Sequence, residues 1–268
     1  MKMTQNELVA EAQRIARTKV TPDMDCEERD NILETAMMSL LDAEVTLPIF
    51  GRVGQLAAGG FGPTVAPQLM HHDPRLPQMP DKPTLIDFFR YRFLLSKRGG
   101  MHLLQSAALA MKNGLPEKLV LACLLHDVAV VGYIRSDHGY HGAQLVEPYV
   151  DEEVAWAIRY HQVLRFYPDP VNGYEYPKLY MSWFGEDYVP PDYVRADAEF
   201  ARGHKWYMSA RLVTMNDLYS FDPNVHVEID QFTDIIGRHF KQPKDGLGFD
   251  RSPVAHMWRS IIWPNNFL

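Results

Sequence analysis

The sequence predicts an all-α protein. Apolar residues recur at helical spacing over most of the chain, strand-type alternation is scarce, and Gly and Pro gather in the stretches between the periodic segments. With 268 residues, the chain has the length of one large domain, or of one domain with a substantial extension. A hydrophobic fraction of 46% supplies enough apolar residues for a core.

The first part of the chain is expected to form helices and then an irregular cover. Residues 1–50 show two helical patterns separated by residues 21–25, and the second begins with acidic residues, which the helix dipole favours. Residues 51–83 are rich in Gly and Pro and are expected to form a loop or meandering segment. Residues 1–83 are therefore predicted to be an N-terminal helical and Gly/Pro-rich cover.

Helical spacing returns at Thr84 and continues to residue 241, which predicts a helical core over residues 84–241. Pro at a helix start, Gly at a helix end and acidic first turns mark several boundaries. The expected helices are 84–95, 101–114, 116–127, 139–150, 151–164, one or two between 192 and 221, and 228–240 as the last. Residues 242–268 are predicted to be a C-terminal tail packed on the core.

Charge and composition exclude several classes of partner. The net charge is −7 and no basic block stands out, so neither nucleic acid nor an anionic membrane is expected as a partner. Cys26 and Cys123 are too few for a disulfide scaffold. The first 20 residues lack the pattern of a signal peptide, and no run reaches the roughly 20 apolar residues that span a bilayer. A cytoplasmic location is expected, and the oligomeric state is left open.

The segment "LLHDVAVVGY" sets His126 beside Asp127 at the end of an apolar run. An ionised carboxylate in a core costs several kcal/mol unless a cation or strong donors compensate it. Asp217 also follows an apolar run, and a metal ion is the simplest compensation for both carboxylates. Imidazole and carboxylate donors without a thiolate favour iron, manganese or zinc. Because a carboxylate has two oxygens, Asp127 can also bridge two metal ions.

Eleven histidines are present, and most need no function. A single His among apolar helix residues is more often a hydrogen-bonded core residue than a ligand, so the prediction rests on the set. Three further histidines are added to His126 and Asp127 because each stands on a separate expected helix. They are His102, His161 and either His138 or His141. The others lie in loops or polar stretches and are not expected to bind metal; they include His71, His72, His226, His239 and His256.

The order H…HD…D, with helices of this length between the motifs, resembles the HD-domain superfamily of all-α metal enzymes. The resemblance implies an HD-domain helical bundle with an N-terminal helical and loop extension. "HGYHGAQLV" is similar to the H-x-x-x-G-A segment of the dinuclear branches, which selects His138 rather than His141, and "AIRYHQ" is similar to the segment that supplies a further ligand. The ligands so implied are His102, His126, Asp127, His138, His161 and Asp217.

Three branches of the HD-domain superfamily that bind two metal ions are candidate matches for this chain. Cyclic-di-GMP phosphodiesterases of the HD-GYP type carry a Glu after the second of two histidines, where this chain has Gln162. "HLLQSAALA" and "LVLACLLHD" resemble the phosphonate-cleaving HD oxygenases, and "IRYHQ" and "DLYSF" resemble inositol oxygenase. The likeness covers residues 95–222. It implies a mixed-valent pair of iron ions, Fe²⁺ and Fe³⁺, with O₂ and a small organic substrate that binds the ferric ion through an oxygen.

The chain also departs from these relatives. HD hydrolases and inositol oxygenase continue the motif as H-D-x-G-K, but here Ala129 and Val130 occupy the last two positions, and the phosphonate enzymes have a His where Val130 stands. Inositol oxygenase has a Lys four residues after its last ligand, where this chain has Phe221. The Tyr and Glu that gate iron in the phosphonate enzyme have no clear counterpart before His102. These losses argue against inositol and against tight binding of a polyphosphate.

Arg165, four residues after His161, is a candidate to bind a substrate carboxylate or phosphonate, with a solvated surface Arg as the alternative. The aromatic and Pro-rich residues 166–193 are expected to cover the site as a lid, or to form an ordinary surface loop. Together with the apolar side chains noted above, they suggest a pocket for a substrate with one oxygen handle and an apolar body. Further candidates to contact the substrate or to support the ligands are His141, Tyr160, Asn216 and Tyr219, with core packing as the alternative for the two tyrosines.

Three functional hypotheses follow. The favoured one is a non-haem diiron oxygenase in which the six ligands hold two iron ions and Asp127 bridges them. The second is a metal-dependent HD phosphohydrolase, with manganese or zinc possible in place of iron; the missing Lys counts against it because phosphate esters need cationic partners. The third is a regulatory HD module that binds a ligand without turnover, which would not need to keep all six ligand positions.

Overall fold

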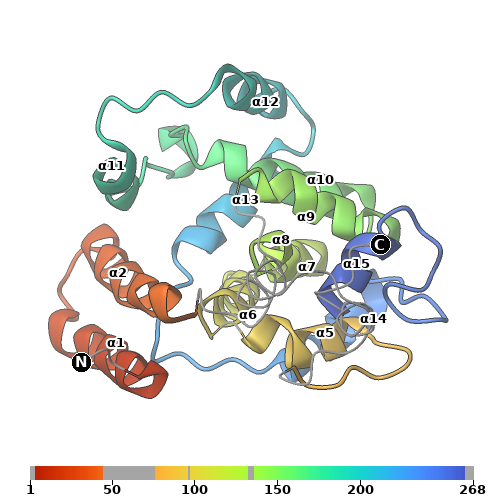
Figure 1. Ribbon diagram of the computed structural model, residues 1–268. Coiled ribbons are helices and arrows are strands. Elements are labelled where there is room, and N and C mark those ends of the chain that lie inside the picture. Colours follow the sequence, from red (N-terminus) through yellow and green to blue (C-terminus); the bar gives the residue numbers. More distant parts are fainter. Residues whose placement is uncertain (1–3, 45–75, 96, 132–135, 263–268) are drawn as a thin grey trace, which may run out of the picture.

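The computed structural model describes residues 4–44, 76–95, 97–131 and 136–262. Its regular structure in these ranges is helical, apart from one isolated bridge between Asp169 and Tyr174, so the predicted all-α class is confirmed (Figure 1). Among the described helices, none has both the length and the apolar character that a bilayer crossing requires.

The structure defines thirteen α-helices and four short 3-10 helices in the described ranges. The α-helices are α1 (Gln5–Lys19), α2 (Cys26–Glu44), α5 (Leu85–Tyr91), α6 (Lys97–Lys112), α7 (Glu117–Leu125), α8 (Val128–Val131), α9 (His138–Val146), α10 (Glu152–Leu164), α11 (Lys178–Phe184), α12 (Asp192–Arg202), α13 (Tyr207–Leu218), α14 (Thr233–His239) and α15 (Ala255–Ile262). The 3-10 helices are η1 (Phe93–Leu95), η2 (Glu147–Tyr149), η3 (Pro170–Asn172) and η4 (Ile229–Phe232).

Helix α7 forms the centre of the core, as its apolar composition predicts. All residues from Leu119 to Leu125 are buried. Helices α6, α7 and α8 lie in the middle of the molecule, and α9 and α10 run side by side along one flank with α13 beside them (Figure 1). The motif that ends α7 is therefore surrounded by the helices that carry the other predicted ligands.

The two N-terminal helices form a pair that packs against the core. Helix α1 begins with a capping box in which Thr4 accepts a hydrogen bond from the Glu7 backbone and the Glu7 side chain accepts one from Thr4. Helix α2 packs on α1 and also contacts α6 and α11 (Figure 1). The loop predicted for residues 51–83 lies largely outside the described residues, and the division of the chain at residues 83 and 241 stays a prediction.

The expectation that residues 228–240 hold the last helix was wrong, because α15 follows. Its Trp258 is fully buried, packs edge-on against Phe88 with ring centroids 4.8 Å apart, and donates a hydrogen bond to the Leu145 carbonyl at 2.6 Å. Burial of this large side chain against distant helices holds the short segment in place. The segment 166–193, expected to form a lid or a surface loop, contains helical structure, since η3 and α11 lie within it.

Candidate metal centre

The chain brings His126 and Asp127 to one centre because two helices end and begin there. Helix α7 ends at Leu125, His126 keeps helical backbone angles as its C-cap, and α8 begins at Val128. Both side chains are buried. The change of helix at this point lets two neighbouring side chains face the same space, which residues inside a single regular helix do not do.

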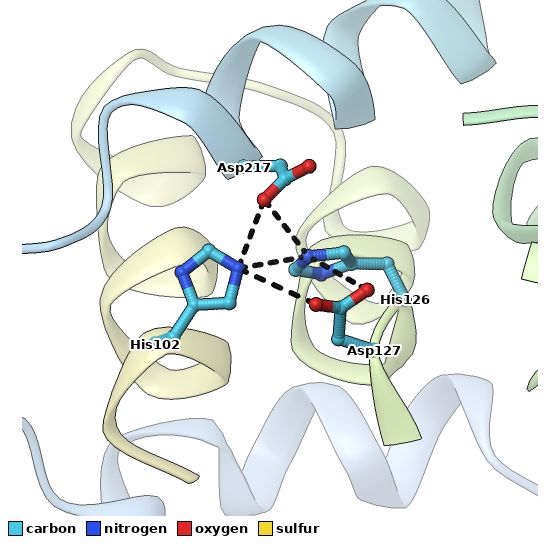
Figure 2. Close-up of side chains that lie close together, drawn as sticks. All are labelled: His102, His126, Asp127 and Asp217. Carbon is cyan, nitrogen blue, oxygen red and sulfur yellow. Dashed lines mark hydrogen bonds and ion pairs between the residues drawn. The ribbon is translucent and has the colours of Figure 1, made fainter. Parts of the chain in front are cut away.

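The first cluster consists of His102 from α6, His126, Asp127 and Asp217 from α13, and Figure 2 shows these side chains pointing toward one another. The Nε2 atoms of His102 and His126 are 3.1 Å apart. Asp217 Oδ1 lies 2.9 Å from His102 Nε2 and 3.5 Å from His126 Nε2. Four potential ligand atoms therefore surround one small space.

The second cluster consists of Asp127, His138 from the start of α9 and His161 from α10. Asp127 Oδ1 lies 3.2 Å from His138 Nε2 and 3.5 Å from His161 Nε2. The other oxygen, Oδ2, lies 3.9 Å from His102 Nε2. Asp127 thus presents a carboxylate to both clusters.

Gly139 allows α9 and α10 to come close enough to form the second cluster. A Cβ atom at this position would lie 2.7 Å from the Arg159 carbonyl oxygen, which is closer than real Cβ contacts. The Gly139 N–H donates to Gln162 Oε1 at 3.0 Å. This contact joins the residue after His138 to the residue after His161, so it fixes the two imidazoles relative to each other.

Backbone carbonyls hold three of the imidazoles from behind. His102 Nδ1 lies 3.1 Å from the Ser220 carbonyl, His126 Nδ1 2.7 Å from that of Cys123, and His161 Nδ1 2.6 Å from that of Ile158. Since a carbonyl can only accept, we assign the proton to Nδ1 in each ring, which turns the Nε2 lone pair toward the centre. Ligand histidines are oriented in this way in metal proteins.

The donor atoms at the centre fit a pair of cations. Asp127 Oδ1, His161 Nε2 and both Asp217 oxygens are buried and make no hydrogen bond of good geometry with the described residues. Two imidazole lone pairs cannot approach within about 3 Å without a cation or proton between them. Buried acceptors without a donor are costly, and metal ions would compensate them. The buried His/Asp clusters could therefore bind metal ions.

Electrostatics keep the two carboxylates ionised. Burial by itself raises the pKa of Asp217, but Arg165 and then His102 and His126 outweigh it and hold that pKa well below the usual range. The pKa of Asp127 is also well below its usual range, because neighbouring histidines outweigh its burial. Burial lowers the pKa of His161, which favours its neutral form. Burial also acts on His126, but Asp127 and Asp217 outweigh it and raise the pKa of this imidazole, so a metal ion at the first cluster would displace a proton from it. Ionised carboxylates and neutral imidazoles are the forms that bind metal.

A cavity of about 390 Å³ adjoins the two clusters. His102, Asp127 and His138 line it, and Phe166 and α11 contribute aromatic side chains. Val130 and Phe221 also line it, and the Phe221 ring stacks on His102 with centroids 4.0 Å apart. Part of the 166–193 segment therefore lines the same cavity as the two clusters, and its role as a lid stays a prediction.

Arg165 lies at this cavity and not in solvent. Its side chain is 13% exposed, its Nε atom is 3.3 Å from Asp217 Oδ2, and its guanidinium carbon sits 4.9 Å from the Tyr180 ring centroid. The alternative of a solvated surface Arg was therefore wrong. Asp217 on one side and an aromatic ring on the other hold the guanidinium beside the clusters.

The other four candidates to contact the substrate do not line the cavity. Tyr160 packs in the core against Trp156 with ring centroids 4.6 Å apart. The Asn216 amide carbonyl accepts from Asn113 at 3.2 Å, because the turn of α13 that aims Asp217 inward aims its neighbour elsewhere. The remaining two also lie away from the cavity: Tyr219 lines a separate one beside α2, and His141 contacts Tyr140.

Sequence reasoning missed Glu34 of α2. This side chain is 3% exposed and lines the cavity, so a carboxylate does reach the site from a helix before His102. The signal was a Glu between Leu33 and Ala36 on the apolar face of a helix, where an acidic residue is costly without a local role. Nothing in the spacing, however, indicated that α2 packs near the ligands.

Comparison with known families agrees with this architecture. Residues 99–179 match the HD domain family, so this part of the chain is an HD domain. The chain is also similar to a 1-hydroxy-2-(trimethylamino)ethylphosphonate dioxygenase (glycine-betaine-forming) from Leisingera caerulea, with 32% identity over 79 residues. The match covers 25% of this chain and 39% of that enzyme, so the chain spans about two fifths of its relative's length.

Proposed function

We propose that this chain is a non-haem diiron oxygenase that uses O₂ to oxidise or cleave a small organic substrate. In this proposal, His102, His126, Asp127 and Asp217 hold one iron ion, and Asp127, His138 and His161 hold the other. The observation that carries the proposal is the pair of clusters that share Asp127. A site for a single metal ion would not need the second cluster.

Two observations favour oxygenase over phosphohydrolase chemistry. The HD-domain relative is a dioxygenase. In addition, Val130 lines the cavity at the position where HD hydrolases carry a Lys, and Arg165 is the one Lys or Arg side chain among the described lining residues. Phosphoryl transfer needs cations around the phosphate oxygens, and this arrangement supplies few of them.

A mixed-valent iron pair, when bound, would supply O₂ activation at the ferrous ion and a Lewis acid for a substrate oxygen at the ferric ion. The side chains of the protein bind the substrate, orient it and limit the access of water. Arg165 binds an anionic group of the substrate beside the metal pair, and Asp217 and Tyr180 fix the direction of its guanidinium. The Phe221 ring on His102 and the aromatic residues of α11 limit the access of water.

The proposal is tested by O₂ consumption. The protein is prepared without oxygen, loaded with Fe²⁺, partly oxidised, and mixed with O₂ and a panel of small hydroxy acids and hydroxyphosphonates. We expect substrate-dependent O₂ uptake, and no hydrolysis of generic phosphate esters when Mn²⁺ or Zn²⁺ replaces iron.

The matched variants are Asp127→Asn, which removes the shared carboxylate, and His256→Ala, which removes an exposed histidine far from the clusters in sequence. The first should lose O₂ uptake and the second should keep it. If the protein hydrolyses phosphate esters in a way that depends on Asp127 and takes up no O₂, the oxygenase proposal is wrong and the phosphohydrolase hypothesis is supported.

A further inference from the structure

Residues of two kinds line the cavity beside the clusters. His102, Asp127 and His138 of the ligand clusters line it, together with four aromatic residues from the end of α10 onward and from α11. The volume of about 390 Å³ suits a small organic molecule. We call the aromatic part of the lining the aromatic wall; it consists of Phe166, Tyr180, Trp183 and Phe184.

The charges that line the cavity favour a substrate with a single negative charge. Among its described lining residues, Arg165 is the one Lys or Arg side chain, and Glu34 adds a carboxylate. Arg165 is held through its Nε atom, 3.3 Å from Asp217 Oδ2, and through the Tyr180 ring. A guanidinium binds the two oxygens of a carboxylate in parallel. A phosphonate dianion would meet a single guanidinium among the described lining residues.

The aromatic wall contains one stacked pair of rings. Tyr180 and Trp183 lie nearly parallel, with centroids 5.5 Å apart and planes at 27°, and Phe184 stands edge-on to both of them. Arg165 already covers one face of Tyr180. The half-exposed Trp183 therefore offers the stacked pair a place for another flat ring, which the half-exposed Phe184 can meet edge-on.

The distance from Arg165 to the first cluster sets where the oxygen groups of the substrate must be. Arg165 Nε is 3.3 Å from one oxygen of Asp217, and the other oxygen of that carboxylate is 2.9 Å from His102. The carboxylate of Asp217 therefore lies between the guanidinium and the proposed metal position. A hydroxyl and a carboxylate on adjacent carbons can reach both at once.

We propose that the substrate is a 2-hydroxy carboxylate with an aromatic side chain. Its hydroxyl faces the metal centre, its carboxylate binds Arg165, and its ring packs on the aromatic wall at Trp183 and Phe184. This assignment rests on the proposed oxygenase function for the role of the hydroxyl. The roles of the carboxylate and the ring rest on the residues of the cavity alone.

The test measures binding without turnover. The full chain is loaded with Zn²⁺, which is not redox-active, and titrated by calorimetry with four probes that vary one group at a time. Mandelate carries ring, hydroxyl and carboxylate; lactate lacks the ring; benzyl alcohol lacks the carboxylate; 1-hydroxy-1-phenylmethylphosphonate replaces the carboxylate by a dianion. We expect mandelate to bind at least about tenfold more tightly than each of the other three.

Two variants and one control assign the contacts. Arg165→Gln should weaken mandelate about tenfold or more and leave benzyl alcohol unchanged. Trp183→Ala should weaken mandelate and leave lactate unchanged. Phe200→Ala removes a ring that is 57% exposed and does not line the cavity, and it should change none of these affinities. Tighter binding of the phosphonate than of mandelate would overturn the proposal.

Failure of this assignment is distinguishable from failure of the oxygenase proposal. If mandelate fails to bind but a substrate of another class drives O₂ uptake on the iron-loaded protein, the substrate class is wrong and the oxygenase stands. If mandelate binds through Arg165 and Trp183 but no substrate drives O₂ uptake, the binding assignment stands and the chemistry is wrong.

Discussion

The imidazoles at the centre take their orientation mostly from the helices that carry them. His126 and His161 each donate Nδ1–H to the carbonyl of the residue three positions earlier, Cys123 and Ile158 respectively. No dedicated carboxylate is needed behind these rings, because the preceding helical turn provides the acceptor. The tautomer that suits a metal ligand is therefore set by local structure before any ion binds.

A prediction at this scale concerns the second cluster. His138→Ala or His161→Ala removes one of three donors from that cluster and none from the first, so we expect the iron content to fall by about half and O₂ uptake to be lost. The helical circular dichroism should not change, since each replacement removes a side chain without altering the backbone. Iron per chain is measured by elemental analysis after anaerobic loading.

His256→Ala is the matched control, because it removes an exposed imidazole and should leave the iron content unchanged. A His161→Ala protein that keeps two irons per chain and full O₂ uptake would show that the ligand assignment is wrong.

At the scale of elements, the C-terminal end of α10 is the part of the fold that positions the site. It carries both His161 and Arg165, and α13 holds it from one side. Thr214 donates to the His161 carbonyl at 2.8 Å, and the fully buried Arg211 donates to the carbonyls of Leu164 at 3.0 Å and Tyr167 at 3.1 Å. These bonds satisfy carbonyls that the helix itself leaves without a partner.

Arg211→Met should destabilise the fold by about 3 kcal/mol, because it leaves these buried carbonyls without a donor and Asp169 without its nearby cation. Urea unfolding of the metal-free protein measures the change. Arg195→Met provides the comparison, since Arg195 pairs with Asp192 in an exposed position and should cost at most about 1 kcal/mol. Equal stability of the two variants would contradict the role given to Arg211.

A second pair of elements, α7 and α14, is joined by an ion-pair network at the surface. Hydrogen bonds from Arg238 and then His239 lower the pKa of Glu117 from 4.5 to about 2. A carboxylate with a depressed pKa in the folded state stabilises the fold fully above its unfolded pKa and loses this effect as the pH falls. The contribution of Glu117 should therefore be present at pH 7 and disappear between about pH 4.5 and pH 2.

The test compares wild type with Glu117→Gln in metal-free protein across this pH range. The variant should be less stable at neutral pH, and the two unfolding curves should converge as the pH approaches 2. Glu186→Gln, at an exposed residue after α11, should show no such pH-dependent difference. A gap between wild type and Glu117→Gln that stays constant down to pH 2 would contradict this account.

At the scale of the whole molecule, the sequence was sufficient for the class of fold and for the clustering of the predicted ligands. Periodicity revealed most of the helices, and the HD-type spacing selected six residues that the structure brings together. These features are readable because each depends on a local pattern. A metal role for the six residues stays a prediction.

The features that sequence reasoning missed depend on packing between distant segments. Helix α15 is held by one tryptophan against partners more than a hundred residues away, and Glu34 reaches the cavity because α2 packs on α6 and α11. Tyr160 and Asn216 were placed at the site by their closeness in sequence to ligands, but one turn of a helix sends neighbouring side chains in different directions. Only tertiary structure decides which direction faces the site.

The central claim is that six side chains from five parts of the helical bundle hold two cations about a shared carboxylate. Anomalous diffraction at the iron edge, from crystals of the iron-loaded full chain, tests it most directly. We predict two anomalous peaks, one among His102, His126, Asp127 and Asp217 and the other among Asp127, His138 and His161. A single peak, or iron bound away from Asp127, would contradict the claim.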